Sequence, residues 1–375
     1  MTSTLRVGLM FGGRSVEHEV SVISARGVAG ALDEAGLDVV PIGVTGKGRW
    51  LSPERSGQIL AGAERRAEPG SDDDGSGVAV DPGAGRIVLL APGAEPRPIA
   101  VDVVFPLIHG WGGEDGRLQG LLDLARIPYV GPGVTGSAMA MDKVASKKIF
   151  AAHDLPVPRW LSLHEDDYVA AKEAAHARVA SEIGFPAFVK PVHGGSSVGV
   201  SRVTTEDGLA VAFAESFACD LHTVVEEGID AREIECAVLG NDEPQASGLG
   251  EIVPSGEFYD YAAKYLDGTS ELIIPANLDV ETTETVRRHA VTAFRALGLA
   301  GLARVDFLLE RNSGRVYLNE VNTLPGFTPI SMFPKLWQAS GLPFAELVRR
   351  LVDLAEERAA AEGELRTRWQ GDGSS

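Results

Sequence analysis

Two runs of alternating apolar and polar residues lie between residues 304 and 327, and this pattern predicts a β-hairpin. The stretch that separates the runs, Arg311–Gly314, has the composition of a turn. Successive side chains of a strand point to opposite faces of a sheet. One face of the hairpin is therefore expected to be apolar, formed by Val305, Phe307, Leu309, Tyr317 and Val321.

The other face of this hairpin carries charged and amide side chains. With the turn centred on Ser313, Asp306 lies opposite Glu320. Arg304 then lies opposite Asn322. Directly opposite carboxylates lie about 5 Å apart and repel unless a cation separates them. Carboxylate and amide oxygens suit a hard cation such as Mg²⁺, which completes its shell with water and phosphate oxygens. A simpler interpretation is that Arg304 neutralises one acid while the other is solvated, and the hairpin alone leaves both open.

The amino-terminal part of the chain alternates between strand and helix patterns. Apolar runs over residues 6–11, 39–44 and 101–108 predict strands, and apolar residues at helical spacing follow the first run. This pattern predicts a parallel sheet with helices on its faces. Residues 62–98 interrupt it with many Gly, Pro, Asp and Ser residues, and we expect their first half to be a mobile surface insertion.

After residue 141 the order of helices and strands changes. A helix over residues 143–152 is followed by a Gly-rich loop, residues 192–199, between two short predicted strands. The hairpin and a last helix from Pro343 come later. We expect an α/β protein of α+β type with four parts: an amino-terminal parallel α/β domain (1–141), a central domain (142–236), a carboxy-terminal domain (237–366) and a frayed tail (367–375).

The composition narrows the possible partners. Acidic residues outnumber basic ones 53 to 34 among 375 residues, which argues against nucleic acid as the main partner. No apolar run approaches the roughly 20 residues needed to cross a membrane. The two cysteines, Cys219 and Cys236, lack metal-binding spacing, and we expect both to be buried reduced thiols in a cytoplasmic protein.

Two Gly-rich loops in the amino-terminal part carry candidate binding residues. Glu17 follows a Gly-rich turn and lies in a first helical turn, where it is either structural or binds a substrate ammonium group. We expect the adjacent His18 to face solvent. His109 ends a buried strand before the second loop, at the edge of a parallel sheet where ligands collect, although a lone histidine is more often structural.

Further candidates lie in the central part. Lys190 leads from a strand into a loop of small residues whose N–H and O–H groups can bind phosphate, and a flap over a nucleotide is favoured over a plain mobile hairpin. Glu226 and Glu233 either accept hydrogen bonds from a nucleoside or form a solvated acidic turn. The aromatic-rich stretch Tyr259–Tyr265 either closes over a site or packs as a surface loop.

Five stretches together resemble the D-alanine–D-alanine ligases of the ATP-grasp superfamily, over residues 7–354. They are GGRSVEHEVS (12–21), HGWGGEDGRLQG (109–120), VKPVHGGSSVGV (189–200), YDYAAKY (259–265) and RVDFLLERNSGRVYLNEVNTLPGFTPISMFP (304–334). The resemblance implies an ATP-grasp architecture whose domains clamp ATP. It also implies a two-step reaction for peptidoglycan precursor synthesis: ATP phosphorylates one D-alanine carboxylate, and the amine of a second D-alanine displaces phosphate, giving D-alanyl-D-alanine and ADP.

The resemblance also implies a role for particular residues. The catalytic residues would be Glu17, Ser196, Tyr265, Arg304 and Gly326. The substrate-binding residues would be His109, Ser331 and Met332. The nucleotide-binding residues would be Lys143, Lys190, Glu226, Ile229, Glu233 and Lys264. Two Mg²⁺ ions, replaceable by Mn²⁺, would be held by Asp306, Glu320 and Asn322.

The sequence leaves alternatives to this function. They are a D-alanine–D-lactate ligase, another ATP-grasp carboxylate–amine ligase, and a non-catalytic nucleotide-binding module. The intact YDYAAKY stretch favours an amine as the second nucleophile, and the presence of every metal and phosphate residue argues against a module without activity. The resemblance further implies a homodimer, with no nucleic-acid or membrane partner.

Overall fold

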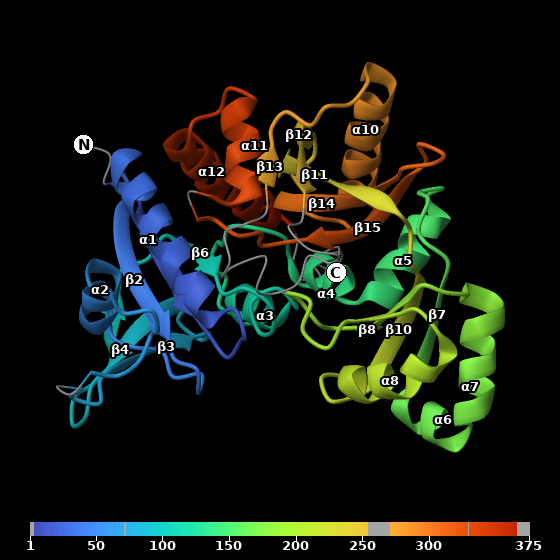
Figure 1. The fold of residues 1–375 in the computed structure, drawn as a ribbon. Helices are drawn as coiled ribbons and strands as arrows, with labels where there is room; N and C mark the ends of the chain where they lie inside the picture. Colours follow the sequence, from blue (N-terminus) through green and yellow to red (C-terminus); the bar gives the residue numbers. More distant parts are fainter. Residues whose placement is uncertain (1–3, 71–72, 254–270, 329, 366–375) are drawn as a thin grey trace, which may run out of the picture.

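The computed structural model describes residues 4–70, 73–253, 271–328 and 330–365, and three groups of elements surround its centre (Figure 1). The amino-terminal part lies on the left in blue, the central part at the lower right in green, and the carboxy-terminal part at the top in orange and red. Within these described ranges, no helix is long and apolar enough to span a membrane.

The amino-terminal part contains the predicted parallel sheet, in the order β2-β1-β6. A second, antiparallel sheet has the order β3-β4-β5. The strands are β1 (Arg6–Gly12), β2 (Asp38–Val44), β3 (Gly77–Asp81), β4 (Arg86–Leu90), β5 (Arg97–Ile99) and β6 (Val103–Leu107). The helices are α1 (His18–Glu34), α2 (Pro53–Ala61), α3 (Arg117–Leu124) and α4 (Val134–Met141).

One expectation for this part is wrong and another is met only in part. Residues 62–66 are exposed, as expected for a surface insertion, but Ala67 is fully buried in the core, and residues 77–99 form the antiparallel sheet. His18 does not face solvent but is 2% exposed, because its Nδ1 lies 2.7 Å from the Gly13 carbonyl oxygen and its Nε2 accepts the Ala67 N–H at 2.8 Å. The imidazole therefore anchors this segment to the start of α1.

The central part is an antiparallel sheet in the order β7-β10-β8-β9, covered by helices. Its apolar core includes Leu161, Val189 and Phe213. Cys219 in this part is exposed rather than buried as expected, whereas Cys236 is buried. The elements are α5 (Lys143–Ala152), β7 (Trp160–His164), α6 (Glu165–Ala170), α7 (Lys172–Arg178) with a π-helical turn (Val179–Ile183), β8 (Ala187–Pro191), β9 (Ser201–Val203), α8 (Leu209–Phe217) and β10 (His222–Glu227).

The carboxy-terminal part is a five-stranded antiparallel sheet in the order β13-β12-β11-β14-β15. The expected domain limit after Cys236 falls inside β11, so a division by sheets lies between Glu227 and Ala231 instead. The elements are β11 (Ala231–Gly240), β12 (Gln245–Val253), β13 (Glu271–Ile273), α10 (Val280–Ala296), β14 (Gly301–Glu310), β15 (Val316–Asn322), α11 (Met332–Ala339) and α12 (Phe344–Gly363).

Both faces of this sheet take part in apolar cores. Helix α10 packs on one face, with Phe294 against Phe307 in a shared core. The other face shares a core with the amino-terminal sheet, which joins Leu9 of β1, Leu302 of β14 and Phe333 of α11. The amino- and carboxy-terminal parts are therefore packed against each other through a common core.

The predicted hairpin consists of β14 and β15. Asp306 pairs with Glu320 and Arg304 pairs with Asn322, as predicted. The register then shifts between Asp306 and Phe307, so that Phe307 pairs with Leu318. This bulge inserts one residue and turns the following side chains to the other face. Val316 and Leu318, not Tyr317, therefore complete the buried apolar face.

Candidate active site

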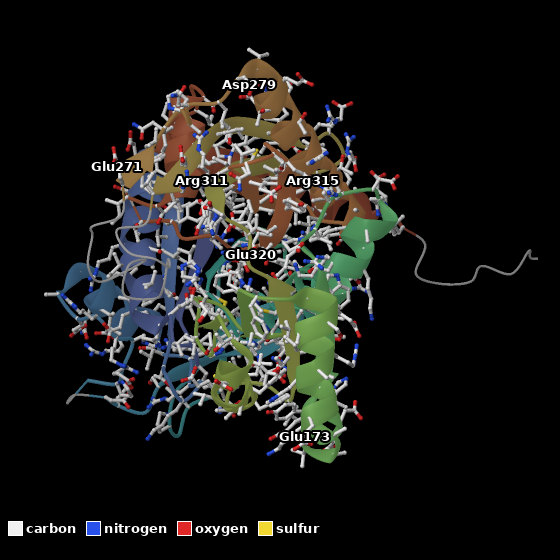
Figure 2. All side chains as sticks on the ribbon, turned by 45° about the vertical axis from the view of Figure 1, so that its right-hand side comes forward. Glu173, Glu271, Asp279, Arg311, Arg315 and Glu320 are labelled. Atoms are coloured by element: carbon white, nitrogen blue, oxygen red, sulfur yellow. The ribbon has the colours of Figure 1, made fainter. Side chains whose placement is uncertain are left out.

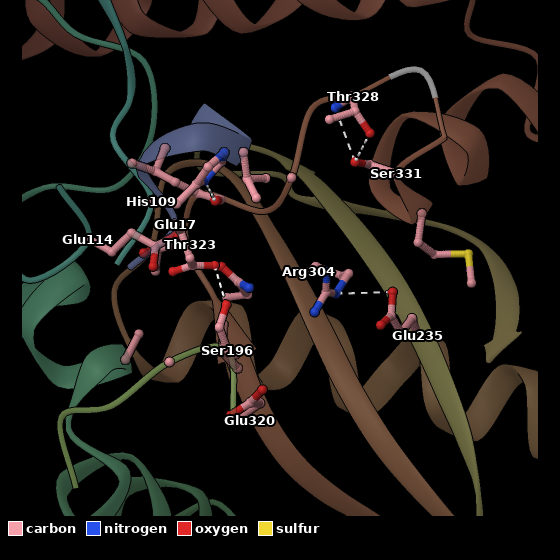
Figure 3. Close-up of a pocket in the computed structure, with 18 of the residues that line it drawn as sticks. Glu17, His109, Glu114, Ser196, Glu235, Arg304, Glu320, Thr323, Thr328 and Ser331 are labelled. Atoms are coloured by element: carbon pink, nitrogen blue, oxygen red, sulfur yellow. Dashed lines mark hydrogen bonds and ion pairs between the residues drawn. The ribbon is translucent and has the colours of Figure 1, made fainter. Parts of the chain in front are cut away.

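A cavity of about 820 Å³ lies where the three parts meet. Its lining comes from all of them: Glu17 and His109, Lys143 and Ser196, and Arg304 and Glu320 (Figure 3). Figure 2 shows Glu320 between Glu173 on α7 and Asp279, the N-cap residue of α10. The cavity is therefore assembled by the tertiary fold and not by any one of the parts.

Most of the candidate residues line this cavity. They are Glu17, His109, Lys143, Ser196, Arg304, Glu320, Asn322, Gly326, Ser331 and Met332. Asp306, Lys190, Glu226, Ile229 and Glu233 do not line it. Tyr265 and Lys264 lie outside the described residues.

Glu17 and Ser196 meet at the amino-terminal side of the cavity. Glu17 is the N-cap residue of α1 and is 8% exposed. The Ser196 hydroxyl, in the Gly-rich loop after β8, donates a hydrogen bond to Glu17 Oε1 at 2.5 Å. Ser196 has φ of 51°, in the left-handed region that few residues other than glycine adopt. The loop thus holds an unfavourable backbone conformation where it reaches the amino-terminal part, as at many ligand sites.

His109 lies beside this pair at the end of β6. Its Nδ1 is 2.9 Å from the Leu324 carbonyl oxygen, and its Nε2 is 3.3 Å from Ser24 Oγ. Burial lowers the pKa of His109, although the charge of Glu17 partly opposes this shift. A neutral imidazole held by these two contacts can position neighbouring groups in the cavity without adding charge.

Glu114, which was not among the residues predicted from the sequence, also lines the cavity. It accepts a hydrogen bond from the Gly110 N–H at 3.0 Å. Burial, and then the charge of Glu17, raise the pKa of Glu114 well above its usual value. Its position in the Gly-rich stretch after His109 could have suggested a role in binding. Sequence spacing alone does not show that its side chain points into the cavity.

A cluster of buried charges lies at the central side. Glu226 is 3% exposed and contacts Lys147 Nζ at 3.1 Å and Lys190 Nζ at 3.0 Å. Burial alone would raise the pKa of Glu226, but the two lysines outweigh it and hold the pKa at about 2. The side chain of Glu226 is therefore engaged with lysines. Lys147 was also missed, although it follows Lys143 by four residues on α5, the spacing of one helix face.

Lys143 connects this cluster to the cavity. Its Nζ donates to the carbonyl oxygen of Gly194 in the Gly-rich loop. Burial lowers the pKa of Lys143, and the charge of Glu320 opposes the shift. The charges of Glu226 and Glu320 outweigh burial at Lys190 and raise its pKa. Two lysines and Glu320 therefore form one electrostatic unit, and a phosphate group brought here would meet positive charge.

The candidate metal ligands lie on one face of the hairpin. Arg304 binds Asp306 through two hydrogen bonds, Nε to Oδ1 at 2.8 Å and Nη2 to Oδ2 at 2.7 Å. This pair matches the simpler interpretation for Asp306. The Asn322 Oδ1 atom is buried and has no hydrogen-bond partner among the described residues. This amide oxygen lies beside Glu320, and a hard cation bound there would give it the partner that it lacks.

No group of three or more His, Cys, Asp or Glu side chains within the described part of the chain is arranged to hold a metal ion. A cation here would therefore depend on the Asn322 amide and on oxygens from a bound phosphate as well as on the two acids. Mg²⁺ commonly binds with few protein ligands and completes its shell in this way. The residues present fit such an ion.

The opposite end of the cavity is formed by the segment after β15 and the start of α11. A side-chain Cβ at Gly326 would lie 2.9 Å from Ser331 Oγ, so the position has no room for a larger residue. Ser331, the N-cap residue of α11, accepts the Thr328 N–H at 3.1 Å. The Gly326 backbone and Arg304 thus line the same cavity as the Ser331 hydroxyl.

Comparisons with known proteins identify the family. Residues 6–132 match a model described as D-ala D-ala ligase N-terminus, and residues 149–353 match D-ala D-ala ligase C-terminus. A D-alanine--D-alanine ligase of Geobacillus thermodenitrificans is 47% identical over 353 residues, which cover 94% of this chain and 96% of the relative.

Solved structures agree with these sequence matches. The D-alanine-D-alanine ligase from Coxiella burnetii is 35% identical, with a TM-score of 0.83 and 97% of each chain covered. The VanG D-Ala:D-Ser ligase from Enterococcus faecalis is 34% identical, with a TM-score of 0.81, and the match covers 94% of this chain and 100% of that one.

The fold and the cavity therefore define an α/β ligase of ATP-grasp architecture. More narrowly, the chain belongs to the D-alanine–D-alanine ligase family. The predicted family, fold class and enzyme, an ATP-dependent D-alanine–D-alanine ligase of peptidoglycan precursor synthesis, are confirmed.

Proposed function

We propose that the cavity is the active site at which two D-alanine molecules are joined at the expense of ATP, with the residue roles expected from sequence. The observation that supports this proposal is the convergence of Glu17, Ser196 and Arg304 on one cavity from three parts of the chain. A reaction that brings together two small amino acids and a nucleotide needs such a junction, because positioning provides much of the rate acceleration.

Glu17 binds the ammonium group of the first D-alanine, and Ser196 holds the Glu17 carboxylate in place. Tyr265 completes this set in the proposal. The carboxylate of the first D-alanine then points toward the lysines, where ATP transfers its γ-phosphate. Lys143, Lys190 and Lys264 stabilise the negative charge of the transferring group, which is the main requirement of phosphoryl transfer. Glu226, Ile229 and Glu233 hold the nucleoside.

In the second step the amine of the second D-alanine attacks the acyl phosphate. The Arg304 guanidinium and the Gly326 N–H stabilise the negative oxygen of the tetrahedral intermediate, and phosphate leaves. Ser331 binds the carboxylate of the second D-alanine, with Met332 beside it. His109 lines the pocket of the first substrate. The products are D-alanyl-D-alanine, ADP and phosphate.

Asp306, Glu320 and Asn322 would hold two Mg²⁺ ions, which Mn²⁺ could replace. When bound, such ions neutralise the phosphate oxygens during transfer. The orphaned Asn322 Oδ1 atom beside two opposed acids supports this assignment.

Substituting Glu320→Gln tests the metal assignment, because it removes a ligand charge while keeping the side-chain shape. Turnover in Mg²⁺ should fall more than about a hundredfold, measured as ADP release with D-alanine. Glu310→Gln is the matched control, since Glu310 ends β14 on the same hairpin but outside the cavity. Retention of most activity by the folded Glu320→Gln variant contradicts the assignment.

The identity of the second substrate needs its own test, because one similar structure is named a D-Ala:D-Ser ligase. We propose strict use of D-alanine. Competition of D-alanine with D-lactate and D-serine near neutral pH, with product masses, tests this. A dominant ester or a D-serine product overturns it. L-alanine, which should give no product, tests the chirality of the first site.

The assembly and location complete the proposal. We propose a cytoplasmic homodimer with three domains, the first ending near residue 141 and the second ending between Glu227 and Ala231 rather than at residue 236. The tail expected at residues 367–375 lies outside the described residues. Light scattering on the purified chain tests the dimer, and limited proteolysis tests the division.

A further inference from the structure

Three carboxylates stand in one row across neighbouring strands of the carboxy-terminal sheet. Glu235 of β11 pairs directly with Asp306 of β14, which pairs directly with Glu320 of β15. Directly paired residues of antiparallel strands share a face and lie about 5 Å apart. The sequence pointed to Asp306 and Glu320, but Glu235 lies 71 residues before Asp306, and its membership in the row follows only from the strand register.

Arg304 provides the positive charge within this row. Its Nε atom lies 3.1 Å from Glu235 Oε2, a contact drawn in Figure 3. The same atom lies 2.8 Å from Asp306 Oδ1, so the guanidinium is shared between two carboxylates. The side chain of Glu235 is 7% exposed and that of Arg304 is 18% exposed. Arg304 donates its Nε–H to Asp306 and faces Glu235 as an ion pair. Because both side chains are largely shielded from solvent, the attraction between Arg304 and Glu235 is stronger than that of a surface ion pair.

The two acids that contact Arg304 differ in the role proposed for them. Under the proposed function, Asp306 would give its oxygens to a metal ion, and Arg304 would then lose Asp306 as a partner. Glu235 lines the cavity but faces Asp306 from the side away from Glu320 and Asn322. It therefore remains as the acid that can keep the guanidinium in place.

We propose that Glu235 is a positioning residue: it retains Arg304 at the oxyanion position and thereby releases Asp306 for metal binding. This inference rests on the proposed function. When the charge of Glu235 is removed, Asp306 is the acid of the row that still binds Arg304 through hydrogen bonds. The guanidinium then competes more strongly with the metal ion for the Asp306 carboxylate. The same substitution also removes a negative charge beside Asp306, and this loss further weakens cation binding.

The test is Glu235→Gln, which keeps size and hydrogen-bonding capacity. We expect the Mg²⁺ concentration for half-maximal activity to rise about tenfold, and kcat at saturating Mg²⁺ to fall about tenfold. The KM for the first D-alanine should stay within about twofold. Mn²⁺ binding to the enzyme with ADP, followed by the loss of the free-Mn²⁺ EPR signal, gives a readout independent of turnover and should weaken to a similar degree.

Glu251→Gln is the matched control. Glu251 lies on β12, is 7% exposed and binds Arg232 through two hydrogen bonds of 2.8 and 2.6 Å, but it does not line the cavity. Its loss removes a comparable Arg–Glu pair and should leave the Mg²⁺ and Mn²⁺ dependence unchanged. Glu235→Asp, which keeps the charge, should restore metal affinity toward the wild-type value.

The results of these measurements distinguish a failure of the role proposed for Glu235 from a failure of the proposed function. If wild type requires Mg²⁺ and folded Glu235→Gln has unchanged metal dependence, the positioning role is wrong and the proposed function stands. If Glu235→Gln and Glu251→Gln shift the metal dependence equally, the effect is structural and the positioning role is again wrong. If wild type neither requires nor binds a divalent ion, both proposals fail.

Discussion

The Ser196 hydroxyl donates a 2.5 Å hydrogen bond to the Glu17 carboxylate, and this contact joins residues 179 positions apart in the chain. Ser196 belongs to the Gly-rich loop of the central part, whereas Glu17 begins α1 of the amino-terminal part. The contact therefore connects two parts of the molecule across one side of the cavity. It holds the carboxylate of Glu17, which is proposed to bind the substrate ammonium group, in an orientation that neither part could provide alone.

Replacing Ser196→Ala should remove this orientation. A hydrogen bond to a charged group contributes about 1.5–3 kcal/mol, so kcat/KM for D-alanine should fall about ten- to a hundredfold. The measurement is initial rate against D-alanine concentration at saturating ATP. Ser201→Ala is the control, because the Ser201 hydroxyl donates to Glu215 on an exposed surface at the base of the same loop. Equal losses in both variants would mean that the loop, not the contact, matters.

Lys147 offers a prediction about nucleotide binding. Lys147→Met keeps the buried stem but leaves Glu226 with Lys190 as its lysine partner, so the net charge of the cluster falls by one. The KM for ATP should rise about tenfold because a phosphate group is then attracted less strongly. The KM for D-alanine should hardly change. Both are measured from ADP release.

Lys148→Met is the control for this prediction. Lys148 is the next residue on α5 and is exposed, so its loss removes the same formal charge from the surface. It should leave the KM for ATP near the wild-type value. An unchanged KM for ATP in a folded Lys147→Met variant would show that Lys147 serves packing alone.

The hairpin shows what the sequence predicts well. Alternation with period two fixes which residues share a face, and a short turn fixes which residues pair, so the opposition of Asp306 and Glu320 followed from local pattern. The bulge that turns Tyr317 away from the apolar face did not, since one inserted residue leaves no mark in composition.

Side chains that are buried by residues far away in the sequence are harder to predict. His18 is buried because Ala67, 49 residues later, donates to its ring, and no local signal reveals such a partner. Glu235 and Lys147 lie at strand and helix spacings from the candidates Glu233 and Lys143. Their spacing allowed a role, but only the sheet register and the ion pairs show what they contact.

His193 gives a prediction about pH. Its Nδ1 lies 2.8 Å from Asp220 Oδ2, and its Nε2 lies 3.5 Å from Asp142 Oδ2. Hydrogen bonds to Asp142 and Asp220 raise the pKa of His193 to about 9 from an ordinary value of 6.5. Because the folded pKa is the higher one, the stabilisation is complete below pH 6.5 and disappears as pH rises through about 9.

The measurement is the free energy of unfolding of wild type and His193→Gln from pH 6 to pH 9.5. The difference should be largest at pH 6 and stay below about 1 kcal/mol, because the ring is 43% exposed and solvent screens the pairs. His153→Gln is the control, since the His153 ring lies 2.9 Å from the Ile149 carbonyl oxygen instead of a carboxylate. A difference that grows with pH has the wrong sign for this explanation.

Arg358 of α12 should stabilise the packing of the amino- and carboxy-terminal parts. Its Nη1 donates to the Gly131 carbonyl oxygen and its Nη2 to the Tyr129 carbonyl oxygen at 3.0 Å, while the guanidinium lies 4.4 Å from the Tyr129 ring centre. Arg358→Ala leaves both carbonyls without this donor and removes the cation–π contact. The free energy of unfolding should fall by about 2–3 kcal/mol.

Urea unfolding measures this loss, with Arg349→Ala as the control on the same helix. Arg349 forms a surface pair with Asp353 at 2.8 Å, four residues along, and such pairs contribute only about 0.3–0.5 kcal/mol. A loss confined to Arg358→Ala indicates that the contact across the shared core is what stabilises the protein. Equal losses would instead assign the effect to the helix itself and not to the contact between the two parts.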